Sequence, residues 1–212
     1  MQSSKYIIVF DTETSGLPKR KFGRLPIPQS FEDWCRLVQI AWNVYYVEPE
    51  TATLVERKSF IVKPNDYDIP LEATKIHGIT TEFARENGID ITYLWIYLKE
   101  MMNKYNHPLL VAHNITFDDG VVLSEMCRNN QKDLMQLWCK SDKECTMKMQ
   151  NPNQYIKLVS LYEQCFNELP KENLHTADAD VEVCARCYFH LKKKTIMELD
   201  IMEEDSSGSA SE

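Results

Sequence analysis

The chain has 212 residues, of which 43% are hydrophobic and 26% are charged, and its formal net charge is −8. This length and composition predict one soluble globular domain and argue against a membrane protein, because the apolar runs are shorter than the ~20 residues of a bilayer-spanning helix. The N-terminus has too short an apolar stretch and too early an acid for a secretory signal, so we expect an intracellular protein, cytoplasmic or nuclear.

Much of the negative charge lies at the end of the chain. Residues 198–212 carry six acidic side chains and no Lys or Arg, so residues 1–197 are close to neutral. A near-neutral body is compatible with a polyanionic partner such as nucleic acid, which a strongly acidic surface would repel. We therefore expect one domain over residues 1–197 and an acidic, Ser-rich, disordered tail over residues 198–212.

The seven cysteines are an odd set scattered along the chain, which suits reduced thiols inside a cell. Cys184, Cys187 and His190 have a spacing that invites a zinc site. They fall within one predicted helix, however, and a second pair of ligands at a suitable spacing is missing. Core packing of the cysteines is the favoured interpretation.

The first predicted element is a strand that ends in acid. Residues 5–10 are rich in β-branched and aromatic side chains and lead directly into Asp11 and Glu13. Because side chains alternate along a strand, these two carboxylates point the same way, whereas Thr12 points to the opposite face. Two like charges held together need a counter-charge, which a divalent cation supplies.

The rest of the chain predicts further strands and then helices that alternate with strands. After a polar loop over residues 19–30, strands are expected at residues 35–49, 52–64, 107–114 and 133–141. Helices are expected within residues 69–88 and over residues 90–106, 116–130, 157–166 and 176–194, with Thr116 as an N-cap. This order predicts an α/β fold with a mixed five-stranded sheet flanked by helices, which binds ligands beyond its strand ends.

Two more acidic sites follow the first. Asp118 and Asp119 lie in the first turn of a helix that begins where a buried strand ends. His175 stands five residues ahead of Asp180, a spacing that lets a loop histidine and a helix carboxylate approach one centre. Each of these signals is weak alone, and together they form an ordered set of three motifs.

The motifs resemble a known family, the DEDDh group of proofreading-type 3′-to-5′ exonucleases. This group includes the epsilon subunit of bacterial DNA polymerase III, ribonuclease T and oligoribonuclease. The matching segments are FDTETSGLP, VQIAW, KIHGIT, LVAHNITFD and HTADADV, and the resemblance extends from Tyr6 to about Leu191. The long first loop also resembles homologues from large DNA viruses. The resemblance implies a ribonuclease H-like 3′-to-5′ exonuclease domain over residues 1–197.

The family resemblance also implies a two-metal mechanism. Two Mg²⁺ or Mn²⁺ ions about 4 Å apart can stabilise the attacking and leaving oxygens of a phosphodiester, and hard oxygen ligands suit these ions. By this resemblance Asp11 bridges both ions, Glu13 and Asp180 complete the first site, and Asp118 holds the second largely through water. His175 is then the general base, since an imidazole titrates near neutrality.

Neighbouring acids compete for two of these roles. The family spacing selects Asp118 over Asp119 and Asp180 over Asp178. We expect Asp119 to face solvent and Asp178 to favour the N-terminus of its helix.

Seven further residues are candidates for binding the 3′-terminal nucleotide. They are Thr14, Gly16, Leu17, Ile76, His77, Asn114 and Phe117. Glycine at position 16 permits a close approach of the backbone. Asn114 and Phe117 could equally serve packing, and the preceding His113 is expected to be a hydrogen-bonded core histidine.

The four tryptophans could form a stacking platform for single strands, but most should belong to the core. Trp34 is the exception, because it lies near a loop with four basic side chains, Lys19, Arg20, Lys21 and Arg24. This loop either guides phosphates toward the site or is simply solvated, and the second interpretation is favoured.

The sequence therefore predicts a metal-dependent enzyme that releases nucleoside 5′-monophosphates from the 3′ end of single-stranded or frayed nucleic acid, with DNA favoured over RNA. It would work alone or beside a polymerase in trans, and homodimers occur among the relatives. The alternatives are an oligoribonuclease or RNA-processing exonuclease, or a non-catalytic module that binds nucleic acid or a polymerase. Sugar preference depends on contacts to the 2′-hydroxyl, on which these motifs are silent.

Overall fold

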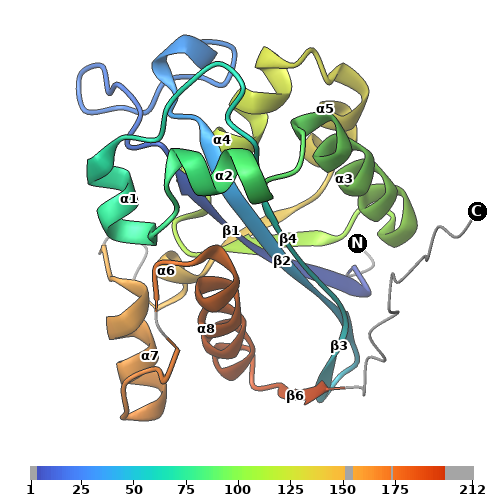
Figure 1. Ribbon diagram of the computed structural model, residues 1–212. Coiled ribbons are helices and arrows are strands. Elements are labelled where there is room, and N and C mark those ends of the chain that lie inside the picture. The colour runs from blue at the N-terminus through green and yellow to red at the C-terminus, as the bar shows by residue number, and fades with distance from the viewer. Residues whose placement is uncertain (1–3, 151–154, 173, 199–212) are drawn as a thin grey trace, which may run out of the picture.

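The computed structural model describes residues 4–150, 155–172 and 174–198. Within these residues a mixed sheet of six strands forms the centre, in the order β5-β4-β1-β2-β3-β6 (Figure 1). β1 pairs antiparallel with β2 and parallel with β4, which confirms the predicted mixed sheet. The strands are β1 (Tyr6–Thr14), β2 (Leu37–Val47), β3 (Thr51–Ile61), β4 (Leu109–Ala112), β5 (Lys143–Cys145) and β6 (Thr195–Glu198).

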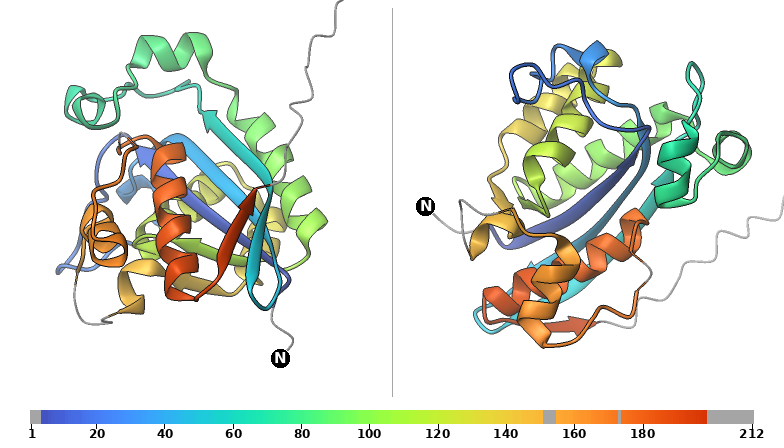
Figure 2. Two further views of the ribbon diagram at one scale, coloured as in Figure 1. Left: turned by 90° about the horizontal axis from the view of Figure 1, so that it is seen from below. Right: turned by 90° about the vertical axis from the view of Figure 1, so that its left-hand side faces the viewer.

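Helices cover both faces of this sheet. Figure 2 shows α3, α4 and α5 on one side of the sheet and α7 and α8 on the other. The helices are α1 (Leu71–His77), α2 (Thr81–Asn87), α3 (Ile91–Tyr105), α4 (Ile115–Arg128), α5 (Lys132–Cys139), α6 (Thr146–Met149), α7 (Leu158–Phe166) and α8 (Ala177–Leu191), with a short 3₁₀ helix η1 (Phe31–Asp33). Among the helices of the described ranges, none has the length and apolar character needed to cross a membrane.

The alternation of side chains along β1 divides the core in two. Ile8 and Phe10 pack toward α3, α4 and α5, whereas Ile7 and Val9 pack toward α8. Continuing the same alternation places Asp11 and Glu13 on the α8 side of the sheet and Thr12 on the α4 side. The end of β1 therefore offers polar groups to both helical layers.

The predicted strand at residues 133–141 is wrong, because α5 occupies most of this segment. Leu134 and Trp138 are both buried, and their spacing of four residues is that of one helical face. The strand of this region is β5, only three residues long and lined by polar side chains, so no apolar pattern announces it.

The sheet has one strand more than the five predicted. The predicted helix over residues 176–194 ends at Leu191, and Lys193 turns the chain with a φ of 55°. β6 then pairs parallel with the first residues of β3 at the edge of the sheet. Glu198, the first residue of the predicted tail, belongs to this strand, and residues 199–212 lie outside the described part of the chain.

The predicted N-cap of α4 is also wrong. Asn114 is the N-cap, with a left-handed φ of 67°, and Thr116 lies inside the helix. Asparagine is among the few residues apart from glycine that enter this region readily, and here it turns the chain sharply from β4 into α4. The turn brings the first residues of α4 beside the end of β1.

All four tryptophans are buried, including Trp34, which is 6% exposed. Its Nε1 donates to the carbonyl of Ile27 at 3.2 Å. Its ring rests on α4, where a Cβ added at Gly120 would lie only 2.0 Å from the nearest ring carbon. Trp34 therefore anchors the loop that follows β1 and is not the exposed stacking aromatic considered from the sequence.

The cysteines of α8 pack as the sequence favoured. Cys184 and Cys187 are buried in two adjoining parts of the core, whereas His190 is exposed. All seven cysteines lie in the described ranges and carry free thiols.

Candidate active site

Three carboxylates converge at the end of β1. One carboxylate oxygen from each of Asp11, Glu13 and Asp180 lies within 4.8 Å of the others. Asp11 and Glu13 come from β1, which lies between β2 and β4, and Asp180 comes from the first turn of α8. Among the residues that the structure describes, these three form the acidic group able to hold a cation.

Asp118, in the first turn of α4, reaches the same end of β1 through Thr12, and its charge acts on Asp11. Its carboxylate is buried and accepts hydrogen bonds from the backbone N–H of Thr12 at 3.2 Å and from the Thr12 hydroxyl at 2.7 Å. The ladder between β1 and β4 ends at the pair Val9 and Val111, so the N–H of Thr12 lies beyond it and is free for this carboxylate.

His175 precedes α8 and is exposed, with a φ of 80°. Its backbone N–H donates to Asp180 Oδ2 at 3.2 Å. The backbone of His175 therefore makes the predicted approach to Asp180, and its imidazole lies at the surface beside the acidic group.

Burial and mutual repulsion disfavour the ionised forms of the carboxylates. Burial raises the pKa of Asp11 well above its usual range, and the charges of Asp118, Asp180 and Glu13 raise it further. Burial, followed by the charges of Asp180 and Asp118, raises the pKa of Glu13 to about 8. Burial raises the pKa of Asp118 to about 7 against the hydrogen bonds from Thr12, and it also raises the pKa of Asp180. Such an all-oxygen donor set fits a hard divalent cation, whose charge would reverse these shifts.

The neighbouring acids Asp119 and Asp178 have structural roles. Asp119 was expected to face solvent, and this prediction is wrong. Its carboxylate accepts a hydrogen bond from Trp138 Nε1 at 2.7 Å and forms an ion pair with Lys143 at 2.7 Å. Asp178 is exposed in the first turn of α8, as expected, and accepts from Gln39 Nε2 at 3.0 Å.

Gln39 is a buried residue of the site that sequence reasoning missed. It lies opposite Glu13 in the register of β1 and β2. Its Oε1 accepts from the backbone N–H of Ala177 at 3.2 Å, while its Nε2 donates to Asp178. Gln39 thus ties the first turn of α8 to the sheet. A polar residue within the apolar run LVQIAW was the available signal.

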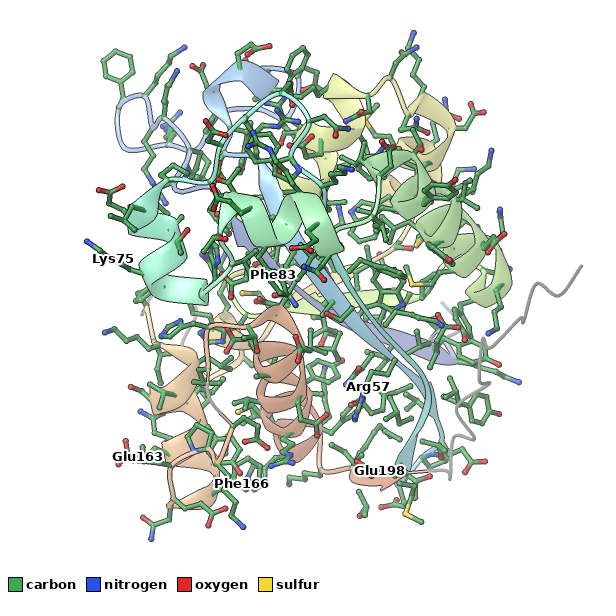
Figure 3. The ribbon with its side chains drawn as sticks, viewed as in Figure 1. Arg57, Lys75, Phe83, Glu163, Phe166 and Glu198 are labelled. Atoms are coloured by element: carbon green, nitrogen blue, oxygen red, sulfur yellow. The ribbon has the colours of Figure 1, made fainter. Side chains whose placement is uncertain are left out.

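A second contact secures the next turn of α8. Arg57 of β3, which Figure 3 shows between β3 and α8, forms an ion pair with Glu182 at 3.2 Å. Asn43 of β2 donates to the same carboxylate at 3.3 Å. These contacts hold the second turn of α8 against the sheet, whereas Gln39 holds the first turn, which carries Asp180.

The candidate substrate residues surround the end of β1. The Thr14 hydroxyl donates to the carbonyl of Gly16 at 2.7 Å, and Gly16 has a φ of 142° that favours glycine. Leu17 is 85% exposed and Ile76, on α1, is 60% exposed. Two exposed apolar side chains are therefore offered by the loop after β1 and by α1.

His77 differs from the other candidates because it is buried. Its Nδ1 accepts from the backbone N–H of Ile79 at 3.1 Å, and its Nε2 has no hydrogen-bond partner among the described residues. Burial lowers the pKa of His77, and the nearby backbone of Thr14 partly offsets this effect.

The segment at the start of α4 contains both structural and candidate residues. His113 is hydrogen-bonded as predicted, with Nδ1 2.9 Å from Thr146 Oγ1 and Nε2 2.8 Å from the carbonyl of Ile156. Phe117 packs against the larger core, and Asn114 forms the turn. A contact of Asn114 or Phe117 with substrate remains a prediction.

The comparisons with known proteins agree with this site. A family model described as Exonuclease matches residues 8–188. The chain therefore belongs to this exonuclease family, and the resemblance identified from the motifs is confirmed. A comparison with curated proteins gave no match.

Solved structures of E. coli Exonuclease I share the fold. The complex with a dA16 oligonucleotide has a TM-score of 0.65 and 20% identity, over 91% of this chain and 41% of that chain. The complex with a dT13 oligonucleotide has a TM-score of 0.67 and 19% identity, over 91% and 42%. A zinc-bound form with single-stranded DNA has a TM-score of 0.63 and 20% identity, over 90% of this chain and 41% of that chain. The chain thus spans about two-fifths of these proteins, and the likeness confirms the predicted ribonuclease H-like fold class.

We expect Gln39→Leu to lower nuclease turnover by about 10- to 100-fold, as loss of a group that orients a ligand does. Asn43→Leu is the matched control, because Asn43 is a buried amide of the same strand that bonds α8 one turn farther along. Turnover and thermal unfolding of both variants measure the difference. Equal losses of turnover in the two variants would contradict a positioning role for Gln39.

Burial of Glu13 should also make the stability of the metal-free protein depend on pH. Its ordinary pKa is 4.5 and its pKa in the fold is about 8, so between these values the folded state keeps a proton that the unfolded state has lost. We expect the free energy of unfolding in EDTA to fall as the pH rises through this range, and to fall less in Glu13→Gln. Urea unfolding measures this. The assignment fails if Glu13→Gln keeps the slope of the wild type, with the exposed Glu72→Gln as control.

Proposed function

We propose that this protein is a metal-dependent 3′-to-5′ exonuclease acting on single-stranded or frayed nucleic acid, with DNA favoured, and releasing nucleoside 5′-monophosphates. The observation that carries the proposal is the convergence of Asp11, Glu13 and Asp180, with the buried Asp118 bonded to Thr12 at the same strand end, in a chain of the exonuclease family. Buried carboxylates that repel one another are suited to a multiply charged cation rather than to an apolar or anionic ligand.

The proposed cofactors are two Mg²⁺ or Mn²⁺ ions, which when bound stabilise the attacking and leaving oxygens of a phosphodiester. Asp11 would contribute to both ion sites. Glu13 and Asp180 would complete one site, and Asp118, held by Thr12, would serve the other largely through water. The oxygen-only donor set and its raised pKa values support this assignment.

His175 is proposed as the general base. Its imidazole accepts a proton from the attacking water, the role that histidine most often takes in general acid–base catalysis. Two observations support this role: the exposed position beside the carboxylates and the backbone hydrogen bond to Asp180. Its left-handed φ of 80° is an energetically costly conformation, and such conformations are more common at functional sites.

The 3′-terminal nucleotide is proposed to bind beside the end of β1. Leu17 and Ile76 offer exposed apolar contacts to its base or sugar, and the backbone near Thr14 and Gly16 offers hydrogen bonds. The unpartnered Nε2 of His77 is a further polar group at this place. The single-stranded oligonucleotides bound to E. coli Exonuclease I support single-stranded DNA as the favoured substrate.

The direct experiment follows 5′-labelled single strands of DNA and RNA with Mg²⁺, Mn²⁺ or EDTA. We expect a metal-dependent ladder that shortens from the 3′ end. Asp11→Asn should lower the rate at least about 100-fold, and His175→Ala about 10²- to 10⁴-fold. Asp178→Asn is the matched control, since this exposed acid of α8 lies outside the acidic group and asparagine can still accept from Gln39.

Several outcomes would overturn parts of the proposal. A rate in Asp11→Asn equal to that of Asp178→Asn would contradict the metal-ligand role. An undiminished rate in His175→Ala would remove the general base. The DNA-to-RNA rate ratio decides between the favoured substrate and an RNA-directed enzyme. Intact folding with no cleavage of either polymer would leave a non-catalytic binding module.

A further inference from the structure

The loop that follows β1 carries a short hairpin next to the proposed site. Lys21 and Arg24 exchange two backbone hydrogen bonds, of 3.1 and 3.0 Å, across the pair Phe22 and Gly23. Both central residues have positive φ, 52° for Phe22 and 74° for Gly23. This is the tight two-residue turn that normally takes Asn-Gly or Asp-Gly.

Phe22 is an unusual residue for this turn. A bulky side chain with φ > 0 is a conformational outlier that costs energy. Phe22 is fully exposed, with a relative accessible surface of 103%, so burial in the core does not offset that cost. The fold therefore gives no reason for a phenylalanine at this position, whereas a ligand that covers the ring would give one.

The hairpin is held in place by the rest of the loop. The N–H of Lys19 donates to the carbonyl of Asp33 at 2.7 Å, and the Lys21 ammonium pairs with the Asp33 carboxylate at 2.8 Å. Just beyond the hairpin, Trp34 fixes the loop through Ile27, as described above. An aromatic tip on an anchored hairpin is pre-organised for contact, which lowers the entropy lost on binding.

The charges around Phe22 favour an anionic partner. Of the four basic residues, Lys21 is neutralised by Asp33, and the Arg20 guanidinium donates to the carbonyl of Gly23 at 3.1 Å. Lys19 and Arg24 form no ion pair within the described residues. These cations stand out in a chain whose net charge is −8.

The hairpin also lies at the correct end of the sheet. Figure 1 shows the loop after β1 projecting at the same end of the sheet as the last residues of β1. Phe22 lies five positions after Leu17, so the tip is within about 18 Å of Leu17. A strand whose 3′ end occupies the site can reach it.

We propose that this hairpin binds the substrate strand on the 5′ side of its terminal nucleotide. The Phe22 ring stacks on an unpaired base, and Lys19 and Arg24 contact the adjoining phosphates. Unpaired bases joined by phosphates are the chemistry that an exposed aromatic ring among cations recognises. The location of the 3′ end rests on the proposed function, whereas the stacking contact is a property of the hairpin itself.

Two substitutions of Phe22 separate stacking from folding. Phe22→Gly removes the ring and relieves the positive φ, so its stability should equal or exceed that of the wild type. Phe22→Trp keeps a stacking surface. Tyr93→Ala is the matched control, because Tyr93 is an exposed aromatic residue, 60% accessible, on α3.

Binding is measured first, as the anisotropy of a labelled oligothymidylate of about twenty nucleotides in EDTA, where hydrolysis does not occur. We expect Phe22→Gly to weaken binding about 5- to 100-fold, the worth of one stacked base. Phe22→Trp and Tyr93→Ala should bind like the wild type. Neutralising Lys19 and Arg24 should reduce the dependence of binding on salt concentration.

Hydrolysis supplies the second measurement. With Mg²⁺, Phe22→Gly should raise the KM of the long strand by a similar factor and leave the kinetics of the p-nitrophenyl ester of thymidine 5′-monophosphate unchanged, because this ester has no base on the 5′ side for the ring to stack on. Wild-type binding and KM in Phe22→Gly would overturn the proposal and leave the exonuclease intact. Conversely, ring-dependent binding without any hydrolysis would support the hairpin and overturn the proposed function. Loss of hydrolysis of the p-nitrophenyl ester in Phe22→Gly would show a structural effect and contradict the stacking role.

Discussion

The structure depends on one electrostatic constraint, which is the repulsion among four carboxylates held near the end of β1. Burial alone disfavours their ionised forms, and their proximity adds to the cost, as the raised pKa values of Asp11, Glu13 and Asp118 show. A fold that keeps such groups together must hold them with other contacts. Thr12 does so for Asp118, and the backbone of His175 does so for Asp180.

The architecture explains how acids far apart in the sequence meet. β1 lies inside the sheet, so helices on both faces can place side chains at its end. The sharp turn at Asn114 brings α4 close enough for Asp118 to reach Thr12, and Gln39 holds the first turn of α8 from the opposite side. The loop after β1 projects from the same end of the sheet and carries the exposed ring of Phe22 at its turn. β1, α4 and α8 thus supply the carboxylates, and the loop after β1 and the end of α1 supply most of the groups proposed to contact substrate.

The sequence was sufficient for the parts of the site that depend on local pattern. Alternation along a strand placed Asp11 and Glu13 together, and the resemblance to the exonuclease family selected Asp118 and Asp180, whose carboxylates lie near Asp11. The sequence was insufficient where long-range contacts decide. The side chain of Asp119 bonds Trp138, and Trp34 is buried against Gly120. Residues 133–141 are mostly helical because the face of α5 with Leu134 and Trp138 packs on the core. Phe22 was passed over because only the backbone reveals its turn and its exposure.

The central claim is that the carboxylate group binds divalent cations, and calorimetric titration of the protein with Mn²⁺ at pH 7 tests it most directly. Because the pKa of Glu13 is about 8 and that of Asp118 is about 7, binding must displace protons, so the heat should depend on the ionisation enthalpy of the buffer. The account predicts two bound ions per chain with release of protons, and loss of one ion in Asp118→Asn. No binding, or binding with the same heat in every buffer, would contradict it.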